Sequence, residues 1–595
     1  MKNRLYFPIT CIFLLIFSAL HAQVNPEITT EELSEEIYFL ASDSLKGRKP
    51  GMPEEVVAAK YVREKFLAAG LELMGNKGFQ EFALVADVKA GTLNTLTFDG
   101  TSALFETDFT PLSFSAGASL AAKAVFAGYG FDINLDTLKW NDYAGIDAKG
   151  KWVLVLRGDP EMEKQSSAFI AFEQERSKVL TAKDKGAAGV IFISPAELEA
   201  KDKLMTLQYD KTAADAGIPV FHITRSFADR MLTTSGYTIA QIEKLFKQDK
   251  KPLSINLTIT INGTSDVIQQ KVTTRNVVGL LRGTDAKLAT EYVIIGGHYD
   301  HLGFGGPGSG SRRPDTLAIH HGADDNASGT AGVIELAEKF SSKRNSLKRS
   351  IVFVAFAAEE MGLLGSREFT RQPLIDLKKV SAMINLDMIG RLNQDTKSIT
   401  IGGSGTSAQS DSLIMALAPN RSFGIRQSPE GYGPSDHASF YSENIPVFFF
   451  FTGSHEDYHT PDDVADKINY KGEKDILEYV FDLAKAIDVM PSMLSFREAG
   501  TKSGARYSRN FKVKLGIMPD MTSAVNNGLG VDGVTKGGPA DLAGINKGDR
   551  IVAIDGQPVT NIYDYMTRLG KLKPGQITSV EIIRNEKKEI ILVQL

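Results

Sequence analysis

The sequence has little cysteine, few long apolar runs and almost no charge imbalance, and each scarcity excludes a class of protein. Its only cysteine is Cys11. Because that residue lies in an apolar N-terminal stretch, a chain processed beyond it has no thiol. Disulfides, thiolate metal ligands and a cysteine nucleophile are then excluded, and any metal site must use His, Asp and Glu. The formal net charge of −5 over 595 residues argues against a nucleic-acid binder that relies on bulk charge.

Residues 1–22 have the pattern of a signal peptide. Lys2 and Arg4 precede the apolar run YFPITCIFLLIFSAL, and Ala22 provides a small residue for cleavage. The alternative is a membrane anchor, but the run is shorter than the about 20 residues that a membrane span requires. No later segment is long and apolar enough to cross a membrane. We therefore expect an exported protein, periplasmic or extracellular, without a stable membrane span after cleavage.

The chain is long enough for several domains, and its local patterns change along its length. Short β-rich runs divided by Gly and Pro, with one helix among them, indicate an insert over 116–265. On either side, residues 23–115 and 266–492 are predicted to form one discontinuous α/β domain. Its near-continuous apolar strands alternate with helices, which predicts a mixed, mostly parallel sheet with helices on both faces. A linker over 493–510 then precedes a small β-rich module over 511–595.

Acids and imidazoles gather where the apolar strands of this sheet end, which is where open α/β sheets bind ligands. Each has an ordinary explanation alone, such as a core histidine, a helix cap or a surface ion pair. Two adjacent glutamates at the end of a buried run are harder to explain, because burying both charges is costly without a cation or a proton. Together these residues predict a cation site: His298, Asp325, Glu359, Glu360, Asp387 and His459.

Nitrogen and oxygen ligands without sulfur suit zinc, although manganese and cobalt accept the same types. The number of carboxylates predicts two ions, about 3.5–4 Å apart and sharing a carboxylate and a water.

Five segments, in this order, carry a resemblance to a known family: GGHYDHLG, GADDNASG, AAEEMGLLGS, NLDMIGR and YHTPDD. They resemble the co-catalytic di-zinc aminopeptidases, a family that also contains bacterial leucyl aminopeptidases, glutamate carboxypeptidase and the glutaminyl cyclases. The early stretch LASDSLKGRKPG is similar to the N-terminal part of that family. The resemblance covers residues 28–115 and 266–490.

The resemblance implies a role for each residue of the set. His298 and Asp387 are expected to be terminal ligands, one on each zinc ion, and Asp325 the bridging carboxylate. Glu360 and His459 are expected to be the remaining terminal ligands.

Three further residues complete the site that the resemblance implies. Glu359 would be the general base that takes a proton from a metal-bridging water and returns it to the leaving amine. Tyr458 would donate a hydrogen bond to the tetrahedral intermediate, and Asp300 would orient His298. The neighbours of Asp325, Asp324 and Asn326, are expected to make local hydrogen bonds.

The expected function is that of a secreted zinc-dependent aminopeptidase with two zinc ions per chain. A carboxypeptidase of the glutamate carboxypeptidase type is the alternative, and it would need a basic pocket, for which Arg312, Arg313 and Arg391 are candidates. A glutaminyl cyclase is disfavoured because those members have Trp, where this chain has Tyr458, before the final ligand. The remaining alternative is a non-catalytic peptide-binding protein.

Two flanking regions resemble known modules. The insert resembles a protease-associated (PA) domain through GKWVLVLRGD and KGAAGVIFIS, and its role is either to wall the substrate cleft or only to pack. The C-terminal module resembles a PDZ domain, in which Leu515, Gly516 and Ile517 would receive a peptide C-terminus on backbone N–H groups and the peptide would add as a strand. The alternative is a degenerate module that only packs on the enzyme.

The segment GFGGPG matches the G-x-G-x-x-G pattern of dinucleotide-binding loops. Such a loop must open a helix directly, and here SGSRRPDT follows. We interpret residues 303–308 as a loop of the active site and expect no nucleotide.

Overall fold

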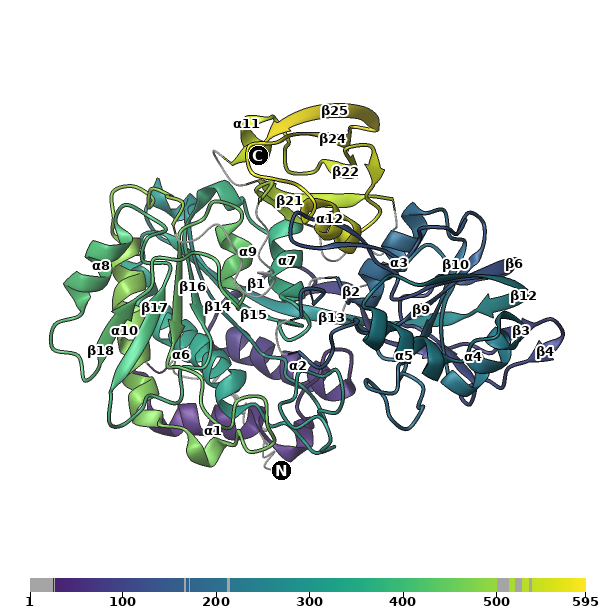
Figure 1. Ribbon diagram of the computed structural model, residues 1–595. Coiled ribbons are helices and arrows are strands. Elements are labelled where there is room, and N and C mark those ends of the chain that lie inside the picture. The colour runs from purple at the N-terminus through teal and green to yellow at the C-terminus, as the bar shows by residue number, and fades with distance from the viewer. Residues whose placement is uncertain are drawn as a thin grey trace, which may run out of the picture.

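The computed structural model describes residues 25, 27–164, 167–170, 172–210, 214–499, 513–519, 527–534 and 538–595. The predicted leader over 1–22 and residues 500–510 of the predicted linker lie outside these ranges. Figure 1 shows an α/β domain, an insert beside it and a small C-terminal module that lies over both. Within the described ranges, no helix is both long and apolar enough to span a membrane.

The α/β domain is built on a sheet whose centre is parallel. In its described part the sheet has nine strands, with the order β1-β13-β15-β14-β16-β19-β17-β18 and β2 paired to β13. The pairs β15–β14, β14–β16 and β16–β19 are parallel. On either side of them, β13 pairs antiparallel with β15, and β17 pairs antiparallel with β19. The strands are β1 (Glu72–Leu73), β2 (Phe79–Ala90), β13 (Val267–Leu281), β14 (Tyr292–His298), β15 (Ser350–Phe356), β16 (Val380–Leu386), β17 (Ser398–Gly402), β18 (Gly424–Gln427) and β19 (Val447–Phe451).

Helices cover both faces of this sheet, as predicted. Alternate strand residues such as Val293 and Ile294 point to opposite faces and join two different cores. α1, α2, α6 and α10 pack on the face of Val293, and α7 and α9 pack on the other face. The helices are α1 (Thr30–Leu40), α2 (Pro53–Ala68), α6 (Gly329–Ser342), α7 (Leu364–Arg371), α8 (Ser410–Leu417), α9 (His437–Tyr441) and α10 (Tyr470–Asp488).

A long antiparallel ribbon of β2 and β13 carries the chain out of the α/β domain and back into it. Between its two strands lies the insert, whose main sheet has eight strands in the described residues, in the order β4-β3-β12-β6-β9-β10-β11-β5. The strands are β3 (Thr95–Phe98), β4 (Thr101–Ser102), β5 (Phe109–Pro111), β6 (Ala118–Ala127), β9 (Trp152–Leu156), β10 (Gly189–Ile193), β11 (Val220–Ile223) and β12 (Ser254–Ser265), with a separate pair β7 (Asp132–Asn134) and β8 (Lys139–Asn141).

The insert differs from the sequence prediction in two respects. Its first strand begins at Thr95 rather than after residue 116, because β3 pairs with β12 at the far end of the insert. It also holds three helices in its described part where one was predicted: α3 (Glu175–Asp184), α4 (Arg225–Leu232) and α5 (Ile239–Asp249). The start of α5 could have been predicted from the sequence, because Thr238 and Gln241 form a reciprocal capping box there.

In its described residues, the C-terminal module is a small sheet with two short helices. Its strands are β20 (Ile517–Pro519), β21 (Leu529–Val534), β22 (Arg550–Ile554), β23 (Gln557–Pro558), β24 (Ile577–Arg584) and β25 (Lys587–Gln594), and its helices are α11 (Pro539–Leu542) and α12 (Ile562–Leu569). Arg568 of α12 is almost fully buried and donates hydrogen bonds to both carboxylate oxygens of Asp184 on α3. This bidentate pair joins the module to the insert.

The first part of the predicted linker packs on the α/β domain instead of standing free. Leu494 is buried in the main core, and Phe496 packs against the core on the opposite face. The backbone N–H of Arg497 donates to the Thr406 carbonyl. Apolar side chains at 494 and 496, within an otherwise polar stretch, account for this difference.

Candidate metal centre

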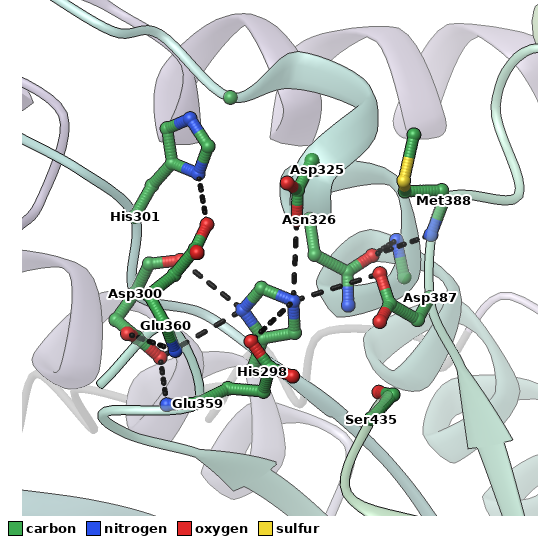
Figure 2. A network of polar contacts seen from close by, with 12 residues as sticks. His298, Asp300, His301, Asp325, Asn326, Glu359, Glu360, Asp387, Met388 and Ser435 are labelled. Atoms are coloured by element: carbon green, nitrogen blue, oxygen red, sulfur yellow. Dashed lines mark hydrogen bonds and ion pairs between the residues drawn. The ribbon is translucent and has the colours of Figure 1, made fainter. Parts of the chain in front are cut away.

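The sheet order brings the predicted residues to one edge. His298 ends β14, the two glutamates Glu359 and Glu360 follow β15, and Asp387 follows β16. β14 lies between β15 and β16, so their carboxyl ends are neighbours. Asp325 reaches the same edge from η4 (Ala323–Ser328), the wide turn that precedes α6, and His459 from the loop after β19. Figure 2 shows the side chains of His298, Asp325, Glu359, Glu360 and Asp387 pointing toward one another.

The first cluster of ligand atoms surrounds the Nε2 atom of His298. That nitrogen lies 3.3 Å from Asp325 Oδ1 and 3.6 Å from Asp387 Oδ1. The three side chains present ligand atoms within 4.8 Å of one another. The prediction that His298 and Asp387 serve different ions is therefore wrong. They lie on the adjacent strands β14 and β16 and face the same point.

The second cluster surrounds the Nε2 atom of His459. This nitrogen lies 3.1 Å from Asp325 Oδ2 and 3.1 Å from Glu360 Oε2. Asp325 thus offers one oxygen to each cluster, which is the arrangement expected of a bridging carboxylate. A residue that the sequence analysis did not select, His301, also lies here, with Nδ1 2.8 Å from Glu360 Oε1. His301, Asp325 and Glu360 form a group of possible ligands within 4.8 Å.

The buried atoms of these clusters fit a cation. Among the residues that the structure describes, no group donates a hydrogen bond to Asp325 Oδ2 or Asp387 Oδ1, and His298 Nε2 has no hydrogen-bond partner. An unpaired buried polar atom ordinarily costs about 1–3 kcal/mol. Carboxylate oxygens and imidazole nitrogens without sulfur are ligands that zinc accepts. The donor set and its unpaired atoms therefore match zinc.

The two adjacent glutamates differ in their electrostatic surroundings. Burial raises the pKa of Glu359 well above its usual range, against the opposing effect of His298 and with a further contribution from Asp387. Burial also acts to raise the pKa of Glu360, but the nearby imidazoles, foremost His459, outweigh it and hold that pKa below its usual range. The two carboxyl groups, although adjacent in the sequence, therefore have pKa values that their surroundings shift in opposite directions.

Asp300 contacts both His298 and the turn that carries Glu359 and Glu360, and its contact with His298 differs from the predicted one. The closest partner of His298 Nδ1 is the backbone oxygen of Asp300 at 3.2 Å, whereas the carboxylate Oδ1 lies at 3.7 Å. The Asp300 carboxylate instead accepts the backbone N–H groups of Glu359, at 3.1 Å, and Glu360, at 3.4 Å. It is buried, and burial raises its pKa to about 7, with His298 opposing. Asp300 therefore positions the turn that carries both glutamates.

The turn that carries Asp325 is held by its neighbours, as predicted. Asp324 Oδ1 accepts the Gly390 N–H at 2.7 Å, and Asn326 Nδ2 donates to the Leu386 carbonyl at 2.9 Å. Both bonds tie this turn to the segment around Asp387. Asp463, which the sequence analysis did not select, accepts the N–H groups of Asp324 and Asp325, each at 3.0 Å. Asp463 is the last residue of the YHTPDD segment, so the resemblance of that segment to the family could have identified it.

The glycine-rich loop supports the last histidine. The Gly310 carbonyl lies 3.0 Å from His459 Nδ1, so that nitrogen donates and Nε2 is left to face the carboxylates. The segment 303–308 opens no helix, and the described chain between 303 and 322 is irregular. As predicted, it is a loop of the site and lacks the helix that a dinucleotide loop needs.

The ring of Tyr458 stacks on His459 at a centroid distance of 3.9 Å, which places Tyr458 next to the second cluster. Burial raises the pKa of its hydroxyl, and the carboxylates of Asp325 and Glu360 raise it further. The hydroxyl therefore stays protonated and able to donate a hydrogen bond.

Three residues at the site adopt the left-handed backbone conformation without being glycine. They are Ala358, which precedes Glu359, Met388, which follows Asp387, and His459 itself, with φ between 55° and 57°. Such conformations cost about 1–3 kcal/mol each and persist where the surrounding structure enforces them. Here the left-handed conformations turn the backbone beside Glu359, Asp387 and His459, and so set the direction of these side chains.

Arg48, in the stretch LASDSLKGRKPG, is a fully buried cation that the sequence analysis did not select. Its guanidinium donates to the carbonyls of Tyr299, at 2.6 Å, and Gly322, at 2.6 Å, and also to those of Leu40 and His321. It ties the segment after His298 to the segment before Asp325.

A cavity opens beside the second cluster, and the insert forms part of its wall. His301 and Glu360 line it from the α/β domain, and Gln208 and Tyr209 line it from the insert. Gln208 packs on Gly308 so closely that a Cβ at Gly308 would meet its side chain. This placement agrees with a wall of the cleft rather than a domain that only packs elsewhere.

Comparisons with known families and proteins match three parts of the chain. The Peptidase family M28 model matches residues 276–484, the PA domain model residues 110–231 and the PDZ domain model residues 513–595. Among curated proteins, Aminopeptidase YwaD of Bacillus subtilis is 26% identical over 57% of this chain and 62% of its own length. A probable leucine aminopeptidase of Arthroderma otae is 29% identical over 36% of this chain and 57% of its own.

The chain thus spans little more than half the length of these curated relatives. Among solved structures, an aminopeptidase from Aneurinibacillus sp. strain AM-1 is similar at 22% identity and a TM-score of 0.47, over 79% of this chain and 95% of that one. Residues 276–484 are therefore similar to peptidase family M28, residues 110–231 to PA domains and residues 513–595 to PDZ domains.

Proposed function

We propose that this chain is an exported aminopeptidase that holds two zinc ions and removes residues from the N-termini of peptides. The observation that carries the proposal is that Asp325 offers one carboxylate oxygen to each of two ligand clusters, with Glu359 beside the first. The names of the relatives, which are aminopeptidases, support the reaction. Export rests on the leader pattern of residues 1–22.

The residues that would hold the two ions follow from the clusters. His298, Asp387 and one oxygen of Asp325 would hold one ion, and His459, Glu360 and the other oxygen of Asp325 the second. When bound, such ions lower the pKa of water to about 7 and polarise the scissile carbonyl.

The chain's own residues would move the proton and stabilise the developing charge. Glu359 accepts a proton from the attacking water and returns it to the nitrogen of the leaving amine, as a general base that becomes a general acid. Tyr458 donates a hydrogen bond from its protonated hydroxyl to the oxygen on which negative charge develops. Asp300 keeps Glu359 in place through the backbone N–H.

The arginines considered for a carboxypeptidase have other partners, which favours the aminopeptidase. Arg313 pairs with Asp462 at 2.7 Å and Arg391 with Asp457 at 3.1 Å. The Arg312 guanidinium donates to backbone carbonyls of the loop before His459. A pocket for a substrate carboxylate would require one of these cations to face the cleft.

The proposed reaction predicts a strict requirement for a free amino terminus. Zinc-loaded protein is incubated with two matched peptide libraries, one with free and one with acetylated amino termini, and products are identified by mass spectrometry. We expect stepwise loss of residues from the N-terminus in the free-amine library alone. Loss of C-terminal residues from both libraries would support the carboxypeptidase, and no cleavage of either library would contradict a peptidase.

We further propose that the PDZ module binds the free C-terminus of a peptide. The segment Leu515–Ile517 reaches the sheet edge at β20, and Gly516 has a φ of +79°, which turns the backbone there. A peptide can extend this edge as a further strand.

Binding at the module should depend on the peptide carboxylate. Acetylated fluorescent peptides, which cannot use a free-amine site, are titrated against the full-length Glu359→Gln variant with either a free or an amidated C-terminus. We expect at least about tenfold tighter binding of the free acid, because charged hydrogen bonds to backbone N–H groups are worth about 1.5–3 kcal/mol. Gly516→Val, which opposes the left-handed backbone, should remove the difference. Equal binding of acid and amide would contradict carboxylate recognition.

A further inference from the structure

His301 lies against the second cluster but differs from its predicted ligands in geometry. Two ligand atoms on one tetrahedral zinc ion, each about 2.0–2.1 Å from it, lie about 3.3 Å apart. The distances from His298 Nε2 and His459 Nε2 to their carboxylate oxygens, 3.1–3.6 Å, agree with this spacing. His301 Nδ1 and Glu360 Oε1 are 2.8 Å apart, which is the nitrogen–oxygen distance of a hydrogen bond to a carboxylate. The ring N–H is not aligned with that oxygen, so Nδ1 has no hydrogen-bond partner among the described residues.

The two oxygens of Glu360 therefore face different partners. Oε2 lies 3.1 Å from His459 Nε2, within the second cluster, whereas Oε1 lies against His301. Figure 2 shows that Nδ1 of His301 points at Glu360 and that the other ring nitrogen points away from the carboxylates. A ring in this position can donate a hydrogen bond to Glu360 through Nδ1, while its other nitrogen faces away from both clusters.

The ring of His301 is held in place from the opposite side. The side chain is buried, and it packs directly on Gly322, where a Cβ would lie 2.5 Å from two ring atoms. Gly322 in turn is bound through its carbonyl by Arg48. The imidazole therefore cannot swing away without moving the segment that leads to Asp325.

We propose that His301 is a positioning residue: in the zinc-bound protein a small turn of its ring lets Nδ1 donate a hydrogen bond to Glu360 Oε1, 2.8 Å away, and this bond aims Oε2 at the second zinc site. This inference rests on the zinc pair of the proposed function. Partners of this kind, which hold a metal ligand without touching the metal, typically contribute 10–100-fold in metal affinity. His301 would then act on the ion at Glu360 and not on the ion at His298 and Asp387.

The test compares variants that keep or lose the donor. Asn places its Nδ2 where His carries Nδ1, Leu has nearly the shape of Asn without a donor, and Gln places its donor one bond farther out. Purified metal-free His301→Asn, His301→Leu and His301→Gln are titrated with zinc against a chromophoric chelator, which yields the affinity of each site without any assay of activity. We expect His301→Leu and His301→Gln to weaken one of two sites by about 10–100-fold. His301→Asn should stay within about threefold of the wild type.

Each other pattern would overturn the proposal. Equal loss of one site in all three variants would make His301 itself a ligand, since an Asn amide cannot replace an imidazole on zinc. Retention of both sites in all three would leave the ring with a packing role only. If His301→Leu fails to fold, equal affinities of the Asn and Gln variants overturn the proposal by themselves. A wild-type protein that binds no zinc would overturn the inference and the proposed function together, whereas zinc binding without peptide cleavage would count against the proposed function alone.

Discussion

Replacing Glu359 by glutamine should lower kcat by about 10²–10⁴-fold while the zinc content of the protein stays unchanged. The reason is that Glu359 has no assigned ligand role, and only its capacity to take and return a proton is removed. Glutamine keeps the size of the side chain, and the backbone N–H that Asp300 accepts is unaffected. Because the proton transfer belongs to the transition state, kcat should fall with little change in KM.

The adjacent residue provides a matched comparison for this variant. Glu360→Gln makes the same chemical change one position later, at a carboxylate whose Oε2 belongs to the second cluster. It should lower the zinc content, and excess zinc should partly restore its turnover, whereas excess zinc should not rescue Glu359→Gln. Both variants are measured by metal analysis and steady-state hydrolysis of a free-amine peptide. Full turnover in Glu359→Gln would rule out Glu359 as the base.

Replacing Asp325 by alanine should remove both zinc ions at once. Asp325 is the only described residue that offers an oxygen to both clusters, at 3.3 Å from His298 Nε2 and 3.1 Å from His459 Nε2. Asp387→Ala, by contrast, should lose only the ion at His298, because Asp387 belongs to the first cluster alone. The expected metal contents are therefore near zero for the first variant and near one per chain for the second.

Thermal unfolding gives an independent measurement of the same effect. A ligand present at a thousand times its Kd stabilises the folded state by about 4 kcal/mol. A chelator should then lower the Tm of the wild type by several degrees and leave the Tm of Asp325→Ala unchanged. Asp324→Asn is the matched control, since Asp324 accepts the N–H of Gly390 and is not predicted to bind zinc. Two ions retained by Asp325→Ala would contradict the bridging role.

Much of the fold could be read from local patterns. Buried parallel strands are continuous apolar runs, and helices such as α1 begin at a capping residue, Thr29, whose side chain accepts the N–H of Glu32. The start of the insert could not be read in this way. The segment from Thr95 pairs with β12, far away in the chain, and no local pattern records that partner.

The same division applies to the site. That six acids and imidazoles would meet at one edge of a sheet followed from the sequence alone, because each stands after a buried strand or opens a helix, and parallel strands end at one edge. Which of them share an ion depended on the order of strands. β14 lies between β15 and β16 in the sheet although it precedes both in the chain.

His298 therefore lies beside Asp387, and the expectation that they serve different ions failed. The sequence by itself determined which types of donor are present, nitrogen and oxygen without sulfur, and the edge of the sheet where they gather. Only the tertiary structure decided how the donors divide into two clusters and that His301 lies against Glu360. Pairings between distant strands and loops depend on packing over the whole domain, and no local run of residues encodes them.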